Sequence, residues 1–159
     1  MSDYSKPTLV YFNLRGRGDV IRLALSQAGV DWAEEGVDYA AMKQGGPDFP
    51  FAQAPAFKHN GLRVVQTDAI LRYIGREWDM YGANNVEATQ IDMIMHGVES
   101  MRGEYLKLCY AESFSEEAKQ AYVSGHVSAT GLAGRNNGAH MQYLEDILGQ
   151  FVILNIFFL

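Results

Sequence analysis

The sequence predicts an α+β fold in which a strand-rich part, ending near Tyr81, is followed by an all-helical part. Up to that point, short apolar runs alternate with helical patterns in the order β-α-β-β-β-α. Beyond Asn85, hydrophobic residues recur at steps of three and four positions, which is the spacing of one helix face. The chain has 159 residues, of which 48% are hydrophobic, enough for one good core or two small ones. We therefore expect two domains, 1–81 and 82–159.

The first part is expected to open with a strand at 8–12 and a helix at 19–29. The run TLVYF is β-branched and aromatic without a polar interruption, which is typical of a strand buried on both faces. The turn that follows it contains two glycines and two arginines, and Gly29 closes the helical pattern. The sequence then predicts a weak strand at 32–38, a Gly- and Pro-rich loop at 44–55, strands at 56–59 and 62–66, and a helix at 67–79.

The second part is predicted to be helical. Its longest helix follows apolar positions that fall on one face, namely Ile91, Ile94, Met95, Val98, Met101, Tyr105 and Leu108. Shorter helices are expected at 116–127 and 141–148, separated by a loop at 131–138 that is rich in glycine and asparagine. The last nine residues, 151–159, are apolar except for Asn155. Such a segment predicts burial, pairing with another chain, or an aggregation-prone end.

The composition argues against several classes of function. The formal net charge is -6, and three local arginines do not make the concentrated basic surface that nucleic-acid binding needs. Cys109 is the only cysteine, so no internal disulfide is expected and a reducing compartment fits best. The four histidines are scattered without metal-ligand spacing, which predicts no metal site. No apolar run reaches the roughly 20 residues that span a bilayer, and the N-terminus lacks an apolar signal core, so we expect a soluble, cytoplasmic protein.

Two places in the first part carry candidate chemistry. Tyr11 ends a strand at a corner where its phenol can reach a ligand, and Arg17 adds positive charge at the helix entrance. Spacing alone favours a simpler interpretation, a core aromatic and a solvated arginine. Thr67 stands where an N-cap is expected, after Gln66 and before an amphipathic helix. A helix N-terminus with a hydroxyl and free N–H groups binds carboxylates well, although a threonine that only caps its helix fits the same pattern.

Four motifs resemble cytosolic glutathione transferases, most closely the pi and sigma classes. They are YFNLRGRGDVIR (11–22), QAPAF (53–57), VVQTDAILRYIGR (64–76) and IDMIMHGVESMRGEY (91–105). The four motifs together identify this family specifically, although each motif alone is weak evidence for it. The resemblance extends from the first strand to about Tyr110. It implies a thioredoxin-like N-terminal domain with a mixed sheet that binds glutathione, and an all-helical domain that helps to bind an electrophile.

The resemblance assigns roles to residues of this chain. It implies that Tyr11 and Arg17 are catalytic, because the tyrosine donates a hydrogen bond to the glutathione sulfur and the arginine adds positive field. The resemblance also implies that the peptide bond before Pro55 is cis, whereas spacing alone fits an ordinary proline at the start of a strand. The resemblance implies further glutathione contacts from Phe12, Met42, Lys43, Gln53, Ala54, Pro55, Gln66, Thr67 and Ser100, an electrophile site with Leu14 and Tyr110, and a homodimer contact through Phe51. Tyr110 is equally well interpreted as a packing aromatic.

The sequence also departs from the family pattern. Met42 stands where these classes usually have a tryptophan that hydrogen-bonds the glycine carboxylate, and a methionine cannot donate; Lys43 is a candidate substitute. Ser100 stands where an aspartate of the partner subunit usually meets the glutathione amino group. Each missing charge-assisted hydrogen bond costs about 1.5–3 kcal/mol, which predicts weak binding. The C-terminal part lacks the later family helices, so we expect a truncated or divergent helical domain.

These observations predict a cytoplasmic glutathione transferase of the detoxification type. It is expected to act on a small hydrophobic electrophile by conjugation or isomerisation, as a homodimer, with glutathione as co-substrate and with no metal, nucleic acid or membrane partner. The alternative is a non-catalytic relative that keeps the fold and binds apolar ligands or a protein. Met42, Ser100 and the short C-terminal part favour the alternative. The enzyme is favoured by the retained residues Tyr11, Arg17, Gln53, Pro55, Gln66 and Thr67.

Overall fold

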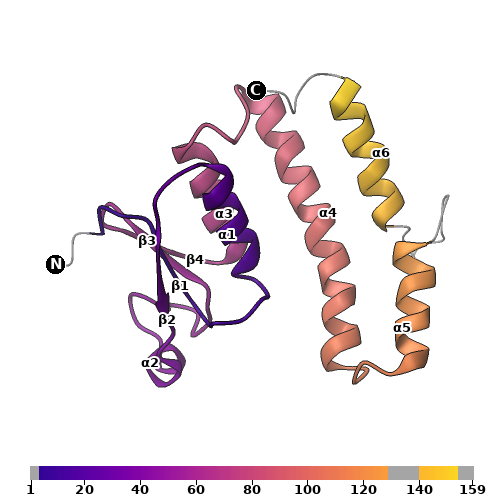
Figure 1. Ribbon diagram of the computed structural model, residues 1–159, viewed down its shortest axis with the longest axis horizontal. Coiled ribbons are helices and arrows are strands. Elements are labelled where there is room, and N and C mark those ends of the chain that lie inside the picture. The colour runs from indigo at the N-terminus through magenta and orange to yellow at the C-terminus, as the bar shows by residue number, and fades with distance from the viewer. Residues whose placement is uncertain (1–3, 129–139, 154–159) are drawn as a thin grey trace. The chain divides into compact units, whose positions relative to one another are not determined.

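The computed structural model describes residues 4–128 and 140–153. The chain divides between Ala83 and Asn84 into two compact units, and each unit is described by itself. Unit 1 contains a four-stranded sheet with three helices, and unit 2 is helical in its described part (Figure 1). The predicted order of a mixed sheet followed by helices is confirmed. None of the described helices is both long enough and apolar enough to cross a membrane.

The sheet of unit 1 has the strand order β2-β1-β3-β4. Neighbouring β1 and β2 are parallel, whereas β3 runs antiparallel to both β1 and β4. All four residues of β1 are buried, as the unbroken apolar run predicts. The strands are β1 (Thr8–Tyr11), β2 (Ala33–Gly36), β3 (Ala56–His59) and β4 (Leu62–Val65).

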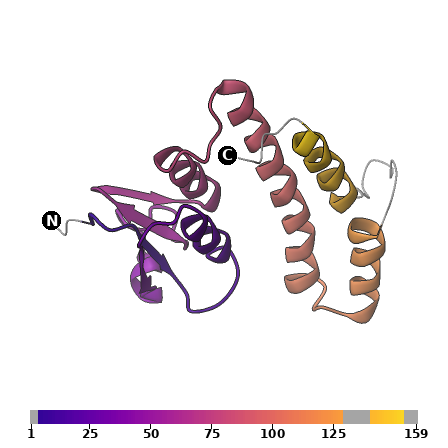
Figure 2. The same ribbon diagram turned by 45° about the horizontal axis from the view of Figure 1, so that its top comes forward.

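Helices cover the two faces of the sheet unequally. On one face lie α1 (Asp19–Gln27) and α3 (Thr67–Glu77), and on the other lies the short α2 (Tyr39–Gln44) (Figures 1 and 2). Because strand side chains alternate between faces, the core has two parts. The larger cluster contains Leu9, Tyr11, Ile21, Leu25, Phe57, Ile70 and Ile74. The smaller cluster, beneath α2, contains Val10, Met42, Phe49 and Ala56.

The structure corrects three local predictions in unit 1. Helix α2 was not expected, because six residues are too few to show a helical period; the Asp38 carboxylate caps it by accepting from the Ala41 N–H at 3.0 Å. The weak strand predicted at 32–38 is limited to β2, at 33–36. Thr67 is the first helical residue of α3 and not its N-cap, since Gln66 occupies the capping position with a φ of 72°.

Unit 2 is built on one long helix. Helix α4 (Asn85–Tyr110) begins at Asn84, whose side-chain oxygen accepts from the N–H groups of Val86 and Glu87. It packs along α5 (Glu116–Tyr122) and α6 (His140–Ile153), as Figure 2 shows. The helix predicted at 116–127 is present as α5 and a π-helical turn at Val123–Val127. The predicted loop 131–138 and residues 154–159 lie outside the described residues.

Candidate functional site

One edge of the sheet gathers three turns that are distant in sequence. The pairs Val10 with Ala56 and Ala56 with Val65 place the end of β1, the start of β3 and the end of β4 side by side. The parallel pair Tyr11 with Gly36 brings the end of β2 to the same edge. The corner at Tyr11, the turn that leads into β3 and the N-terminus of α3 therefore converge there. The sheet register thus brings three motifs that are separate in sequence to one edge.

Tyr11 lies at the centre of this edge and is 8% exposed. The backbone N–H of Arg17 donates a hydrogen bond to the Tyr11 hydroxyl oxygen, with an N···O distance of 3.1 Å. A phenol oxygen that accepts one hydrogen bond still carries its own proton. The Tyr11 hydroxyl is thus oriented by the β1–α1 turn and remains able to donate.

Two glycines of the same turn fit against the Tyr11 side chain. A Cβ at Gly18 would stand 2.3 Å from the Tyr11 Cδ1 atom, and one at Gly16 would stand 3.0 Å from its hydroxyl oxygen. Gly16 also has a φ of 129°, a conformation that favours glycine. The sequence pattern predicts both glycines as turn residues. Their contact with the tyrosine ring shows a second role, which the close spacing in YFNLRGRG could have suggested.

Arg22, which the sequence did not single out, holds the β1–α1 turn together. Its guanidinium donates to the carbonyl oxygens of Phe12 (3.2 Å) and Leu14 (3.0 Å), and it forms ion pairs with Asp19 and Glu34. The hydrogen bond to Glu34 is the main reason why the pKa of Arg22 is raised. Arg17, the predicted source of positive field, is half-buried and contributes its backbone N–H to Tyr11.

The turn into β3 has the geometry that the resemblance implied. The Ala54–Pro55 peptide bond is cis. Pro55 is buried, Ala54 is half-buried, and Gln53 is exposed. Gln53 and part of Ala54 are therefore accessible to solvent at this turn.

The α3 N-terminus provides a polar group without a protein partner. Thr67 is 7% exposed, and within the described part of the chain its Oγ1 has no hydrogen-bond partner. The first N–H groups of a helix are unsatisfied within the helix and favour negative charge. Gln66 precedes Thr67 and is exposed. The arrangement suits a carboxylate that needs both a hydroxyl and backbone donors.

The remaining predicted residues of unit 1 have different surroundings, and Met42 and Lys43 contact other parts of the unit. The Met42 side chain is 3% exposed and packs in the smaller core cluster, so it serves the core. The Lys43 ammonium lies 5.6 Å from the centre of the Tyr39 ring on an exposed surface. Phe12 is half-buried beside Tyr11 with ring centres 5.6 Å apart, and Leu14 is exposed.

The predicted residues of unit 2 are exposed. Ser100 donates its hydroxyl to the His96 carbonyl oxygen of its own helix at 2.9 Å. Tyr110, at the end of α4, is 83% exposed, so it does not pack as a core aromatic within its unit. Phe51, in the loop before β3 of unit 1, is likewise 62% exposed.

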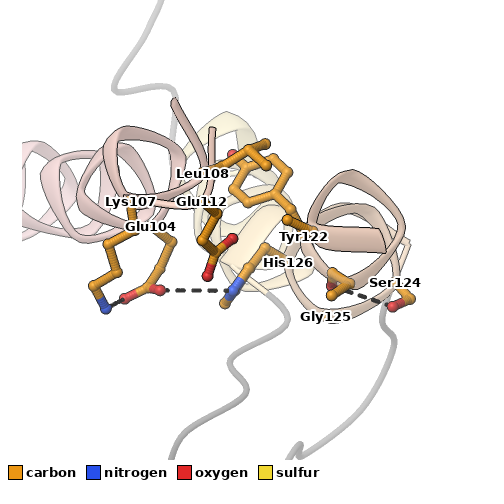
Figure 3. A pocket seen from close by; sticks show the side chains of 10 residues that line it. Glu104, Lys107, Leu108, Glu112, Tyr122, Ser124, Gly125 and His126 are labelled. Atoms are coloured by element: carbon orange, nitrogen blue, oxygen red, sulfur yellow. Dashed lines mark hydrogen bonds and ion pairs between the residues drawn. The ribbon is translucent and has the colours of Figure 1, made fainter. Parts of the chain in front are cut away.

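Unit 2 contains a hollow of about 460 Å³ between α4 and α5 (Figure 3). Glu104 lies between Lys107, at 2.5 Å, and His126, at 4.0 Å, while Leu108 and Tyr122 form an apolar wall. The hydrogen bond from Lys107 lowers the pKa of Glu104. Sequence reasoning missed this hollow because its walls come from different helices. Within residues 4–128 and 140–153, no group of three or more His, Cys, Asp and Glu side chains is arranged to hold a metal ion.

Comparisons with known proteins agree with this geometry. The family model described as "Glutathione S-transferase, N-terminal domain" matches residues 7–76. The chain is 34% identical to Glutathione S-transferase P 1 of Bufo bufo, over 92% of this chain and 77% of that protein. It is 36% identical to Glutathione S-transferase P of Homo sapiens, over 73% of this chain and 55% of that protein. The chain thus spans about half the length of several curated relatives that it matches.

Solved structures show the same fold. The glutathione S-transferase from Ascaris lumbricoides superposes with a TM-score of 0.69 at 27% identity, covering 91% of this chain and 68% of that one. A pi-class glutathione S-transferase of Onchocerca volvulus gives a TM-score of 0.64 at 25% identity, covering 94% of this chain and 78% of that one. The resemblance read from the motifs is confirmed, as is the thioredoxin-like domain followed by a helical region.

Proposed function

Because this chain belongs to the glutathione S-transferase family, we propose that it binds glutathione at the Tyr11 edge of the sheet and activates its thiol. The thiol gives up its proton, and the thiolate attacks a small hydrophobic electrophile; a C–S bond forms and, with an aryl halide, the C–halogen bond breaks and halide leaves. Alternatively the thiolate assists isomerisation of the electrophile. The observation that carries the proposal is the Tyr11 hydroxyl, which is oriented by the Arg17 N–H at 3.1 Å and retains a proton to donate.

The chemistry requires stabilisation of a thiolate. A free thiol has a pKa of about 8.5, so a small fraction is ionised at neutral pH. A hydrogen bond from the Tyr11 hydroxyl stabilises the sulfur anion, and a fall of two pKa units corresponds to about 2.7 kcal/mol. The Arg17 N–H strengthens this donor, because a hydroxyl that accepts a hydrogen bond donates more strongly. The positive charge of Arg17, at the same turn, also favours the sulfur anion.

The peptide part of glutathione has matching partners at the same edge. We propose that Thr67 Oγ1 and the first N–H groups of α3 hold the γ-glutamyl carboxylate. The Ala54 backbone, presented by the cis bond to Pro55, pairs with the cysteinyl unit. Gln53 and Gln66, both exposed beside these groups, supply further polar contacts.

The test is a conjugation assay with glutathione and a generic aryl halide, run on the wild type and on Tyr11→Phe. Loss of the phenol proton is expected to lower kcat/KM by about 10–100-fold near pH 6.5, since up to two pKa units of thiol activation are lost. Retention on immobilised glutathione should be kept by both proteins, because the peptide contacts are unchanged. Equal conjugation rates for the two proteins would refute the proposed catalytic role of Tyr11.

A second candidate is a non-catalytic relative that keeps the fold and binds apolar ligands or a protein. Two observations favour it. Met42 lies in the core and cannot donate to a ligand, and the Ser100 hydroxyl is engaged with its own helix. This candidate would be supported if the wild type is retained on the glutathione resin but conjugates glutathione no faster than Tyr11→Phe does.

The wider assignments are also proposals. We propose a cytoplasmic homodimer, supported by the exposed aromatic ring of Phe51 on a loop that the resemblance places at a subunit contact. Sedimentation of the full chain measures this directly. Leu14 and Tyr110 are proposed to contact the electrophile, and both side chains are exposed.

A further inference from the structure

We propose that Asp48 is a positioning residue. It sets the affinity for glutathione by holding in place the loop that contains Gln53 and Ala54. This inference rests on the proposed function, because it assumes that glutathione binds beside that loop. The loop joins α2 to β3 and covers residues 45–55. The Asp48 carboxylate pairs with Lys58 and Arg63 of the sheet, so its proposed effect on the site passes through the loop.

Two cations face each other on the strands beneath this loop. Lys58 of β3 and Arg63 of β4 are directly paired in the sheet register. Asp48 bridges them: one carboxylate oxygen lies 2.5 Å from the Arg63 Nη1, and the other lies 3.4 Å from the Lys58 Nζ. Like charges directly opposite each other destabilise an antiparallel pair. The carboxylate from the loop therefore neutralises a repulsion that the sheet itself creates.

The Lys58 ammonium is held in place on its other sides. It donates to the Tyr4 hydroxyl at 3.1 Å and to the Glu35 carboxylate at 3.2 Å. Burial lowers the pKa of Lys58, but the hydrogen bonds from Lys58 to Tyr4 and Glu35 and the charge of Asp48 outweigh that effect, and the net pKa is raised. The lysine thus stays charged, and the attraction for Asp48 persists.

The loop depends on this anchor because part of it is strained. Phe49 is buried in the smaller core cluster and anchors the loop beside Asp48. Three residues later, Ala52 adopts a φ of 51°, which a residue with a Cβ adopts only at a cost. Strained residues persist when the surroundings over-determine them. Once the Asp48 contact is lost, the loop keeps the Phe49 anchor but is less constrained, so Ala52 can relax, and Gln53 and Ala54 shift with it.

The experiment compares Asp48→Asn with a matched control, Glu35→Gln. Both substitutions remove one carboxylate charge from Lys58, but Glu35 lies on β2 and joins two strands without touching the loop. Asp48→Asn is expected to raise KM for glutathione about three- to tenfold, with kcat at saturating glutathione within about twofold of the wild type. Glu35→Gln is expected to leave KM unchanged. An equal rise in both variants, or no rise in Asp48→Asn, would overturn the proposal.

A second measurement does not depend on glutathione. Amide hydrogen exchange at the Ala52 N–H, which donates to the Phe49 carbonyl oxygen at 2.8 Å, reports on the loop directly. Faster exchange in Asp48→Asn than in Glu35→Gln supports the anchor, and equal exchange refutes it. If the wild type itself neither binds nor conjugates glutathione, the proposed function fails, while the exchange data still decide whether Asp48 pins the loop.

Discussion

Replacing Thr67 by valine should stabilise the unliganded protein and weaken its binding of glutathione. Valine has nearly the shape of threonine but no hydroxyl. Thr67 is 7% exposed, and its Oγ1 has no partner in the described part of the chain. A buried polar group without a partner costs about 1–3 kcal/mol. Its removal should raise the free energy of unfolding of the free protein by an amount in that range.

The same substitution should have the opposite effect on the ligand. If Oγ1 donates to the γ-glutamyl carboxylate, its loss removes a hydrogen bond to a charged group, worth about 1.5–3 kcal/mol. The dissociation constant for glutathione should therefore rise by about 10–150-fold. Urea unfolding of the free protein measures the first effect, and calorimetric titration with glutathione measures the second.

Thr8→Val is the matched control. Thr8 is also buried, but its Oγ1 donates to the Lys6 carbonyl oxygen at 3.0 Å. Because this hydroxyl is satisfied, its removal should destabilise the protein by about 0.5–1.5 kcal/mol and leave glutathione affinity unchanged. If Thr67→Val destabilises as Thr8→Val does, the Thr67 hydroxyl serves the fold and the reasoning fails. Unchanged glutathione affinity in Thr67→Val would show that the Thr67 hydroxyl does not contact the ligand.

Two further predictions concern packing and pH. In Gly18→Ala the new methyl group would stand 2.3 Å from the Tyr11 Cδ1 atom. Because an ordinary carbon contact is about 3.5–4.0 Å, the ring must move by more than about 1 Å, and kcat should fall by about 100-fold or more. Gly103→Ala, where a Cβ meets nothing within 4 Å, should leave kcat unchanged, and similar rates in both variants would refute the steric argument. Lys107→Met should raise the pKa of Glu104, which Lys107 lowers, as measured by carboxyl NMR titration. A lowered carboxyl pKa stabilises the fold above the unfolded-state pKa, and this stabilisation is lost as pH falls through the folded-state pKa. The variant should therefore lose less stability on acidification than the wild type. An unchanged Glu104 titration would exclude the Lys107 pair as the cause of the lowered pKa.

Much of the fold can be predicted from local sequence patterns. The apolar run at β1 and the three- and four-residue spacing along α4 each indicate one element, and both are present. Helix α2 was not accessible, because its stability comes from the Asp38 cap and from burial of Met42. Burial of that side chain is a tertiary property that six residues of sequence do not reveal.

The site was accessible only in part. The motifs around Tyr11, Pro55 and Thr67 marked three turns, but their convergence follows from strand register, which the sequence pattern does not specify. The roles of Gly18 and Arg22 depend on how one turn folds back on itself. The Asp48 bridge depends on two cations that become neighbours only when β3 and β4 pair.

The register of β3 also has a consequence for folding. Its pairing with β1 joins Val10 to Ala56, a contact that closes a long loop of chain and is therefore slow to form. Until that pairing is made, the Tyr11 corner and the turn at Pro55 are separate segments of chain. If glutathione binds at this edge as proposed, retention on a glutathione resin would report completion of the central sheet. The same resin would separate molecules with correct β1–β3 pairing from those that contain only their local helices.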